Sequence, residues 1–119
     1  MTGLFSYPKR KLRKLINEGE YEQAIKFGNQ LEQKFSNDPD FLFIMGSMYY
    51  ILNDEKKTLY YIDRVLEINE YDVESLSLKL RVHEYLKEND VVIDCCKKIL
   101  KVDPDNFEVR DILDGLEEN

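Results

Sequence analysis

The stretch RVLEINEYD at residues 64–72 recurs 34 residues later as KILKVDPDN at residues 98–106, with apolar residues in the same places. Upstream, EGEYEQAI at residues 18–25 and LNDEKKTL at residues 52–59 are separated by the same interval. A period of this length in a chain with helical patterning is typical of stacked helix pairs, each of which buries a face against its neighbours. The period therefore predicts an all-α solenoid of helix pairs.

The period divides the chain into three repeats at about residues 5–38, 39–72 and 73–106. In each repeat, apolar residues recur at positions 4, 8 and 11 and again at positions 20, 24 and 27, a spacing that places each set on one helical face. Short polar segments separate the two sets at residues 17–20, 53–55 and 87–90. Residues 107–119 add one amphipathic segment that suits a capping helix, so we expect about seven helices.

Local helix signals agree with this frame. Asn37-Asp38-Pro39 offers a capping side chain followed by proline in the first helical turn, where its missing N–H costs nothing. Asp103-Pro104-Asp105 repeats that chemistry ahead of the last segment. We therefore expect helices to begin near these two prolines.

Composition indicates one folded domain over residues 1–119. The chain is 43% hydrophobic and 34% charged, and it has only 5 Gly and 3 Pro, so no flexible linker divides it. Its net charge of −7 is uneven: residues 1–26 carry six Lys/Arg and three Asp/Glu, a balance of +3, and the rest carries −10. An acidic body of this kind repels nucleic acid and anionic lipid.

Cysteine usage and hydropathy predict a soluble cytoplasmic protein. The two cysteines, Cys95 and Cys96, are adjacent and would point about 100° apart on a helix, which makes them poor disulfide partners. The longest uncharged run, from Phe41 to Asn53, is too short to span a bilayer. We expect a reducing compartment and no membrane association.

The repeats resemble the tetratricopeptide repeat (TPR) family. Residues Leu42, Met45, Gly46 and Tyr49 match positions 4, 7, 8 and 11 of its pattern, and Gly19, Tyr21 and Ala24 match its turn and the start of its second helix. Pro104 matches its position 32, whereas Pro8, Lys11, Leu80, Val65 and Ile99 depart from it. The resemblance covers residues 5–106 and implies a right-handed α-solenoid of antiparallel helix pairs.

The resemblance also implies a concave groove lined by positions 2, 5, 9, 12 and 13 of the first helix in each repeat. Carried over, these positions hold Lys9, Arg13, Ile16 and Asn17 in repeat one, Asp40, Phe43, Ser47, Tyr50 and Ile51 in repeat two, and Glu74, Ser77, Arg81, Glu84 and Tyr85 in repeat three. Aromatic residues and arginine dominate interface energies. We therefore expect partner contacts at Lys9, Arg13, Asp40, Phe43, Ser47, Tyr50, Arg81 and Tyr85; the alternative is that the aromatics pack against the neighbouring repeat.

One subgroup of the family binds the C-terminal carboxylate of chaperones through Lys and Asn in repeat one, Asn in repeat two, and Lys and Arg in repeat three. The corresponding residues here are Lys9, Arg13, Ile44, Glu74 and Leu78. Only Lys9 matches, and Glu74 would repel a carboxylate. A chaperone carboxylate partner is disfavoured.

The basic stretch Lys9–Lys14 has two interpretations. It could meet RNA, an anionic surface or an acidic partner. However, Leu12, Leu15 and Ile16 interleave at helical spacing, and only Phe5 and Tyr7 are near enough to stack on bases. A solvated helix face is favoured and nucleic acid is disfavoured.

No constellation of residues suggests catalysis. The single histidine, His83, falls at a packing position without a nucleophile or metal partner in its sequence neighbourhood. Cys96 also falls at a packing position, and a Gly-rich phosphate loop is absent from the sequence. We expect no enzyme activity, no cofactor and no metal.

The leading hypothesis is therefore a protein–protein interaction scaffold that binds an unidentified peptide or protein in its groove. One alternative is an RNA or anionic-surface adaptor that acts through the basic first helix. The other is a self-associating structural subunit, for example a homodimer, because the exposed ends of a solenoid can stack on copies.

Overall fold

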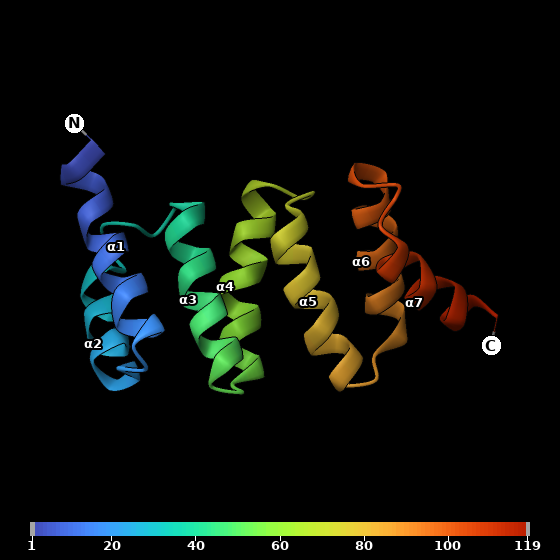
Figure 1. Ribbon diagram of the computed structural model, residues 1–119, viewed down its shortest axis with the longest axis horizontal. Coiled ribbons are helices and arrows are strands. Elements are labelled where there is room, and N and C mark those ends of the chain that lie inside the picture. The colour runs from blue at the N-terminus through green and yellow to red at the C-terminus, as the bar shows by residue number, and fades with distance from the viewer. Residues whose placement is uncertain (1, 119) are drawn as a thin grey trace. The chain divides into compact units, whose positions relative to one another are not determined.

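The structure, a computed structural model, describes the backbone of residues 2–118 and the side chains of residues 7–118. This part of the chain is all-helical (Figure 1). Its seven helices are α1 (Thr2–Asn17), α2 (Tyr21–Leu31), α3 (Pro39–Ile51), α4 (Glu55–Ile68), α5 (Val73–Tyr85), α6 (Asn89–Val102) and α7 (Phe107–Glu117). The predicted number of helices is confirmed, and α3, α5 and α7 begin at the residues where the sequence repeats begin.

The three turns inside the helix pairs share one geometry. Gly19, Asn53 and Lys87 lie 34 residues apart and all have positive φ, at 76°, 60° and 60°. In the first turn the N–H of Gly19 donates to the Ile16 carbonyl and the N–H of Glu20 donates to the Leu15 carbonyl, at 3.0 and 2.8 Å. The other two turns repeat this pair of bonds. This is the Schellman motif, which ends a helix and reverses the chain.

The starts of the first helices depend on side-chain caps. Asp38 accepts hydrogen bonds from the N–H groups of Asp40 and Phe41, and Pro39 occupies the first turn, as expected. The last helix follows Pro104 and begins at residue 107, as expected. Residues 104–105 form a turn, and α7 begins at Phe107 because Asn106 accepts from the N–H of Val109. The first helix differs from expectation, because α1 begins at Thr2 rather than Phe5 and continues through Pro8.

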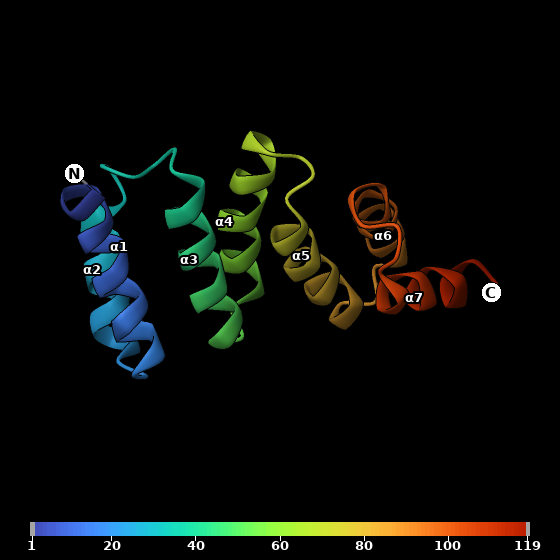
Figure 2. The same ribbon diagram turned by 45° about the horizontal axis from the view of Figure 1, so that its top comes forward.

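The chain divides into two compact units, Met1–Tyr61 and Ile62–Asn119, with the boundary inside α4. The expected single domain stays a prediction, and each unit is described by itself. In the first unit α1 and α2 lie side by side as an antiparallel pair (Figures 1 and 2). Its buried residues include Leu12, Ala24, Phe41 and Met45. Gly28 lets α2 approach closely, since a Cβ there would lie 2.6 Å from Sδ of Met45.

The second unit has its own core, in which α6 packs against α5 on one side and α7 on the other. The core residues are Leu76, Leu80, Val92, Cys95, Cys96, Ile99, Val109 and Leu113. Each helix of this unit thus buries one apolar face and leaves its opposite face for water or for a partner.

Candidate functional site

The first candidate surface lies where α1 meets α3, and we call it the α1–α3 face. Nζ of Lys9 lies 2.9 Å from Oδ2 of Asp38 and 3.4 Å from Oδ2 of Asp40. Arg13 donates through Nη2 to Oδ1 of Asp40. Lys9, Arg13 and Asp40, all predicted partner contacts, are therefore brought together as ion pairs between two helices.

The ion pairs shift the ionisation of their members in opposite directions. The hydrogen bond to Asp38 raises the pKa of Lys9, aided by the charges of Asp38 and Asp40. Burial alone would raise the pKa of Asp38, but the Lys9 hydrogen bond and the N–H groups of Phe41 and Asp40 lower it overall. Both groups are thus held in their charged forms at neutral pH.

The rest of the α1–α3 face is formed by one side of α3. Phe43 and Ser47 are half-buried, and Tyr50 is 40% exposed. They follow Asp40 at intervals of three or four residues and so share its face of the helix. Ile16 differs from expectation, because it is buried in the core and offers no partner contact.

The second candidate surface lies where α5 meets α7, and we call it the α5–α7 face. Arg81 donates to Glu84 on its own helix at 3.0 Å and to Glu108 on α7. These hydrogen bonds, the one to Glu108 first, raise the pKa of Arg81 against the opposing effect of burial. Tyr85, one turn further along α5, is 74% exposed.

Both surfaces use the same cross-helix pair, which sequence reasoning missed. Arg13 pairs with Asp40 and Arg81 pairs with Glu108, each across an interval of 27 residues. Numbered within the 34-residue repeat, each arginine is at position 9, and its acidic partner is at position 2 of the segment that follows. The signal was present in the sequence, because the 34-residue frame makes these positions comparable, but the pairing itself depends on how the helices pack.

A hollow of about 350 Å³ adjoins the α5–α7 face. Its walls come from the end of α5, the following turn, the start of α6 and the outer half of α7. The residues that line it are Glu84, Lys87, Asn89, Val92, Asp111, Ile112, Gly115 and Leu116. The hollow combines apolar walls with both signs of charge, which suits a peptide side chain better than a metal or a phosphate.

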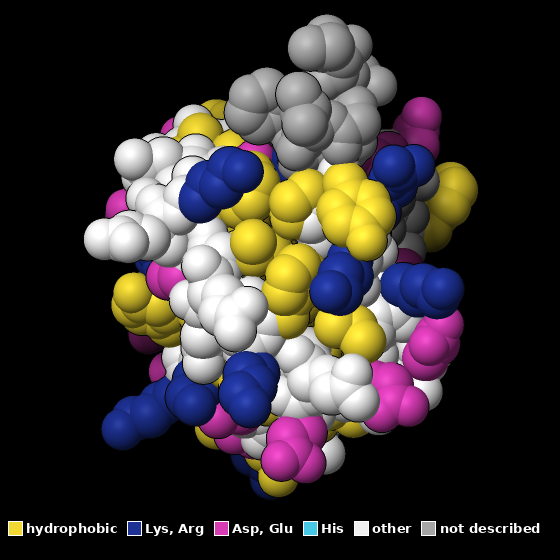
Figure 3. All heavy atoms as spheres, turned by 90° about the vertical axis from the view of Figure 1, so that its left-hand side faces the viewer, with side chains coloured by type: hydrophobic (Ala, Val, Ile, Leu, Met, Phe, Trp, Pro, Cys, Tyr) yellow, Lys and Arg dark blue, Asp and Glu magenta, His cyan; other side chains and the backbone are white. Residues whose placement is uncertain are grey.

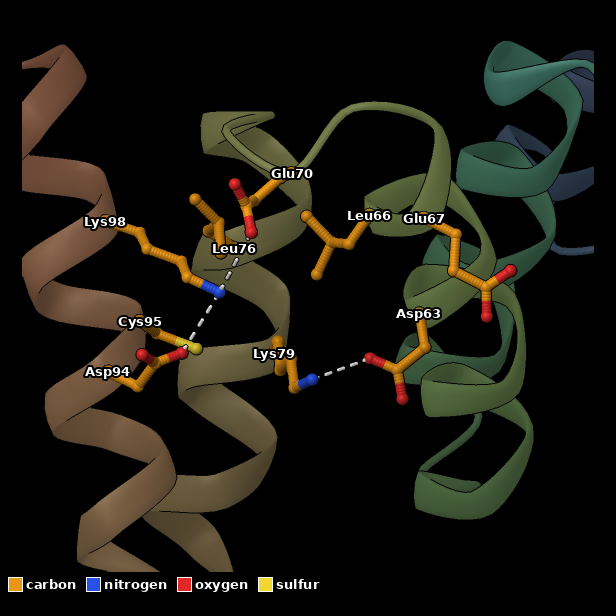
Figure 4. Close-up of a pocket in the computed structure, with 9 residues that line it drawn as sticks. All are labelled: Asp63, Leu66, Glu67, Glu70, Leu76, Lys79, Asp94, Cys95 and Lys98. Carbon is orange, nitrogen blue, oxygen red and sulfur yellow. Dashed lines mark hydrogen bonds and ion pairs between the residues drawn. The ribbon is translucent and has the colours of Figure 1, made fainter.

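A second hollow, of about 360 Å³, lies among α4, α5 and α6 of the second unit (Figure 4). Lys79 points across to Asp63 at 2.8 Å, and Lys98 lies 3.3 Å from Asp94 and 3.9 Å from Glu70. Leu66, Glu67, Leu76 and Cys95 complete its lining. Both lysines of this hollow are therefore already paired with carboxylates.

The two cysteine thiols and the single imidazole are all buried. Cys95 and Cys96 are both buried in the core of the second unit, and burial raises the pKa of each thiol to about 11. His83 is buried, and its Nδ1 lies 3.4 Å from Oε2 of Glu88 without hydrogen-bond geometry. Among the described residues no cluster of three or more His, Cys, Asp or Glu could hold a metal ion. These groups resemble core residues more than catalytic ones.

The outer side of α1 carries a third surface (Figure 3). In that view apolar side chains form a patch with Lys and Arg side chains on several sides. A hollow of about 560 Å³ on α1 is lined by Tyr7, Arg10, Lys11, Lys14, Leu15 and Glu18. The side chain of Phe5, one of the two aromatics considered for base stacking, lies outside the described residues.

No helix within residues 2–118 has the length and apolar character needed to cross a membrane.

Comparison with known proteins supports the fold. The chain matches 14 chains of solved structures. One is the first TPR of Spaghetti (RPAP3) bound to the HSP90 peptide SRMEEVD, with a TM-score of 0.77 and 18% sequence identity over 94% of this chain and 91% of that one. No protein-family model matches, and a search of curated proteins finds no match. The all-α solenoid expected from the period, and the TPR fold expected from the resemblance, are thus confirmed.

Proposed function

We propose that this protein is a non-enzymatic protein–protein interaction module that binds a peptide or partner protein on its α1–α3 and α5–α7 faces. The observation that carries the proposal is the exposure of aromatic side chains on the first helices of the repeats. Tyr85 is 74% exposed and Tyr50 is 40% exposed, although burial of an aromatic ring is favourable. The structural neighbour, which has the same fold, is bound to a peptide.

The arginines add orientation to these faces. Arg13 pairs with Asp40 on α3, and Arg81 pairs with Glu108 on α7. These ion pairs fix the guanidinium groups in place rather than leave them free in solution. An ordered arginine beside an aromatic ring loses little side-chain entropy when a partner binds. We therefore expect Phe43, Tyr50, Arg81 and Tyr85 to make the main contacts, with Lys9, Arg13, Asp40 and Ser47 around them.

The same ion pairs argue against a partner that is recognised by its terminal carboxylate. A carboxylate would have to displace Asp40 from Arg13 or Glu108 from Arg81. Ile44, at one of the positions that the chaperone-binding subgroup requires to be polar, is buried, and Glu74, at another, is an exposed acid. We propose a partner with apolar and aromatic side chains, unlike the acidic HSP90 peptide that the structural neighbour binds.

A reducing compartment such as the cytoplasm belongs to the same proposal. Cys95 and Cys96 are both free thiols that help to form the apolar core. Oxidation of either sulfur would place a polar group in that core and destabilise the second unit.

The test is affinity capture from the native extract with wild-type protein and the double variant Tyr50→Ala/Arg81→Ala. We expect the double variant to lose at least ~90% of the captured partner, because hot-spot truncations cost about 1–2 kcal/mol each. Far-UV circular dichroism and Tm should change little, since both residues are exposed. The matched control is Tyr60→Ala, which removes an exposed tyrosine from α4, a second helix of its pair. Unchanged capture by the double variant would refute the assignment of these faces.

A further inference from the structure

The outer side of α1 carries a row of residues that the groove proposal does not use. Tyr7, Lys11, Lys14 and Glu18 follow one another at intervals of four, three and four residues, so they lie on one face of α1. All four are exposed, and Tyr7 is 59% exposed. They line the hollow of about 560 Å³ described above.

Few nearby carboxylates neutralise the positive charges of the lysines in this row. Lys14 lies 4.0 Å from Glu18, at the outer limit of an ion pair. Nζ of Lys11 lies 4.6 Å from the centre of the Phe27 ring, and within the described residues neither Lys11 nor Arg10 pairs with a carboxylate. In a chain with a net charge of −7, this is a local positive surface next to an exposed aromatic ring.

The cap helix α7 carries a row of the same spacing, with aspartates at the two places that hold lysines on α1. Phe107, Asp111, Asp114 and Glu118 follow one another at the same intervals of four, three and four residues. All are exposed, and Phe107 is 79% exposed. Among residues 7–118 none of these three carboxylates forms an ion pair.

The first three members of the two rows are complementary in pairs, whereas the fourth members, Glu18 and Glu118, are both acidic. Each begins with an exposed aromatic ring, and the next two members are lysines on α1 and aspartates on α7. Two helices that lie side by side in register would bring Lys11 to Asp111 and Lys14 to Asp114, while Tyr7 and Phe107 would meet at one end. Opposite charges flanking apolar contacts are a common way to fix register and partner between helices.

We propose that the outer face of α1 binds the α7 row of a second copy of this chain. The contact is heterologous, because the α1 row of one copy meets the α7 row of another. Each added copy brings one further α1 row and one further α7 row, so association continues until the assembly closes. The contact uses neither the α1–α3 face nor Arg81 and Tyr85, and it shares only Asp111 with the hollow beside the α5–α7 face.

The test is sedimentation velocity from ~10 µM to ~1 mM protein at low and high salt, since surface ion pairs weaken as the Debye length falls. We expect the average mass of the wild type to rise with concentration at ~0.05 M salt and to fall again at ~0.5 M salt. Lys11→Glu/Lys14→Glu and Asp111→Lys/Asp114→Lys should each weaken association by at least ~10-fold, because attraction becomes repulsion at two pairs.

A mixture of the two charge-reversed variants gives the decisive measurement. Each variant alone has two rows of like charge, whereas the mixture contains opposite rows, so association should return only on mixing. The control variant is Lys56→Glu/Lys57→Glu, which changes the net charge as much as Lys11→Glu/Lys14→Glu but alters exposed residues of α4. This control should associate more strongly than Lys11→Glu/Lys14→Glu. A wild type that stays monomeric to ~1 mM would overturn the proposal. So would failure of the mixture to associate, or association of the single variants at wild-type strength.

Discussion

One chemical change, glycine to alanine, is expected to have opposite effects on stability at two positions of this chain. Gly19 has φ of +76° at the end of α1, whereas Gly115 lies within α7. A Cβ added at either position would meet no atom within 4 Å. Steric clash with neighbours is therefore excluded at both sites, and only the backbone conformation distinguishes them.

The magnitudes follow from that conformation. An L-residue in the left-handed region costs roughly 1–2 kcal/mol, and the lower entropy of the unfolded alanine chain offsets about 0.5 kcal/mol of this. Gly19→Ala should thus destabilise the protein by about 1 kcal/mol. At Gly115 the same substitution removes a helix-interior glycine, which should stabilise the protein by about 0.5 kcal/mol near a helix end.

The assay is urea unfolding followed by circular dichroism at 222 nm, with thermal unfolding as a second measurement. A change of 1 kcal/mol corresponds to a shift in Tm of roughly 4 °C for a domain of this size. Lys87→Gly provides an internal check, because Lys87 has φ of 60° at the equivalent turn and should gain stability when the strain is removed. Effects of the same sign for Gly19→Ala and Gly115→Ala would refute the reasoning.

Two further predictions concern ionisation. Because the pKa of Asp38 is lowered in the folded protein, its carboxylate contributes stability that is present above its ordinary pKa of 3.8 and is lost as pH falls through the folded value. Asp38→Asn keeps a cap acceptor but removes the charge paired with Lys9, so it should unfold at lower urea than wild type at pH 7, and this difference should shrink as pH falls below about 4; a difference that persists at pH 2 would contradict the role of the ion pair. Burial raises the pKa of Cys95 and Cys96 to about 11, so both thiols should react with Ellman's reagent at pH 8 at least ~100-fold more slowly in the folded protein than in denaturant, and fast labelling of the folded protein would show that the second unit opens readily.

The helices and turns were predictable because their signals are local. Gly19, Asn53 and Lys87 lie in the three turns predicted from polar composition, and all three share the same helix-ending hydrogen bonds. The start of α1, at Thr2 rather than Phe5, shows the limit of such signals. At the last helix both Asp103 and Asn106 can cap, and only the folded backbone shows that Asn106 does.

The sequence predicted which residues lie on the candidate surfaces, but it did not predict the ion pairs between them. The family resemblance implied that Arg13, Asp40 and Arg81 lie at groove positions of their helices, and the structure shows all three exposed. It did not show that each arginine is already paired, because a contact across 27 residues depends on the distance between two packed helices. Because both arginines are already paired, they are poor receptors for the free carboxylate of a partner.

The sequence by itself determined the repeat length, the helix pairs and the positions of the turns, because helix periodicity and polar turn composition are local signals. Tertiary structure decided which charges meet, that Cys95 as well as Cys96 lies in the core, and that α1 and α7 present complementary rows to solvent. Burial and ion pairing depend on what surrounds a side chain from every direction, and that environment exists only after the helices have packed.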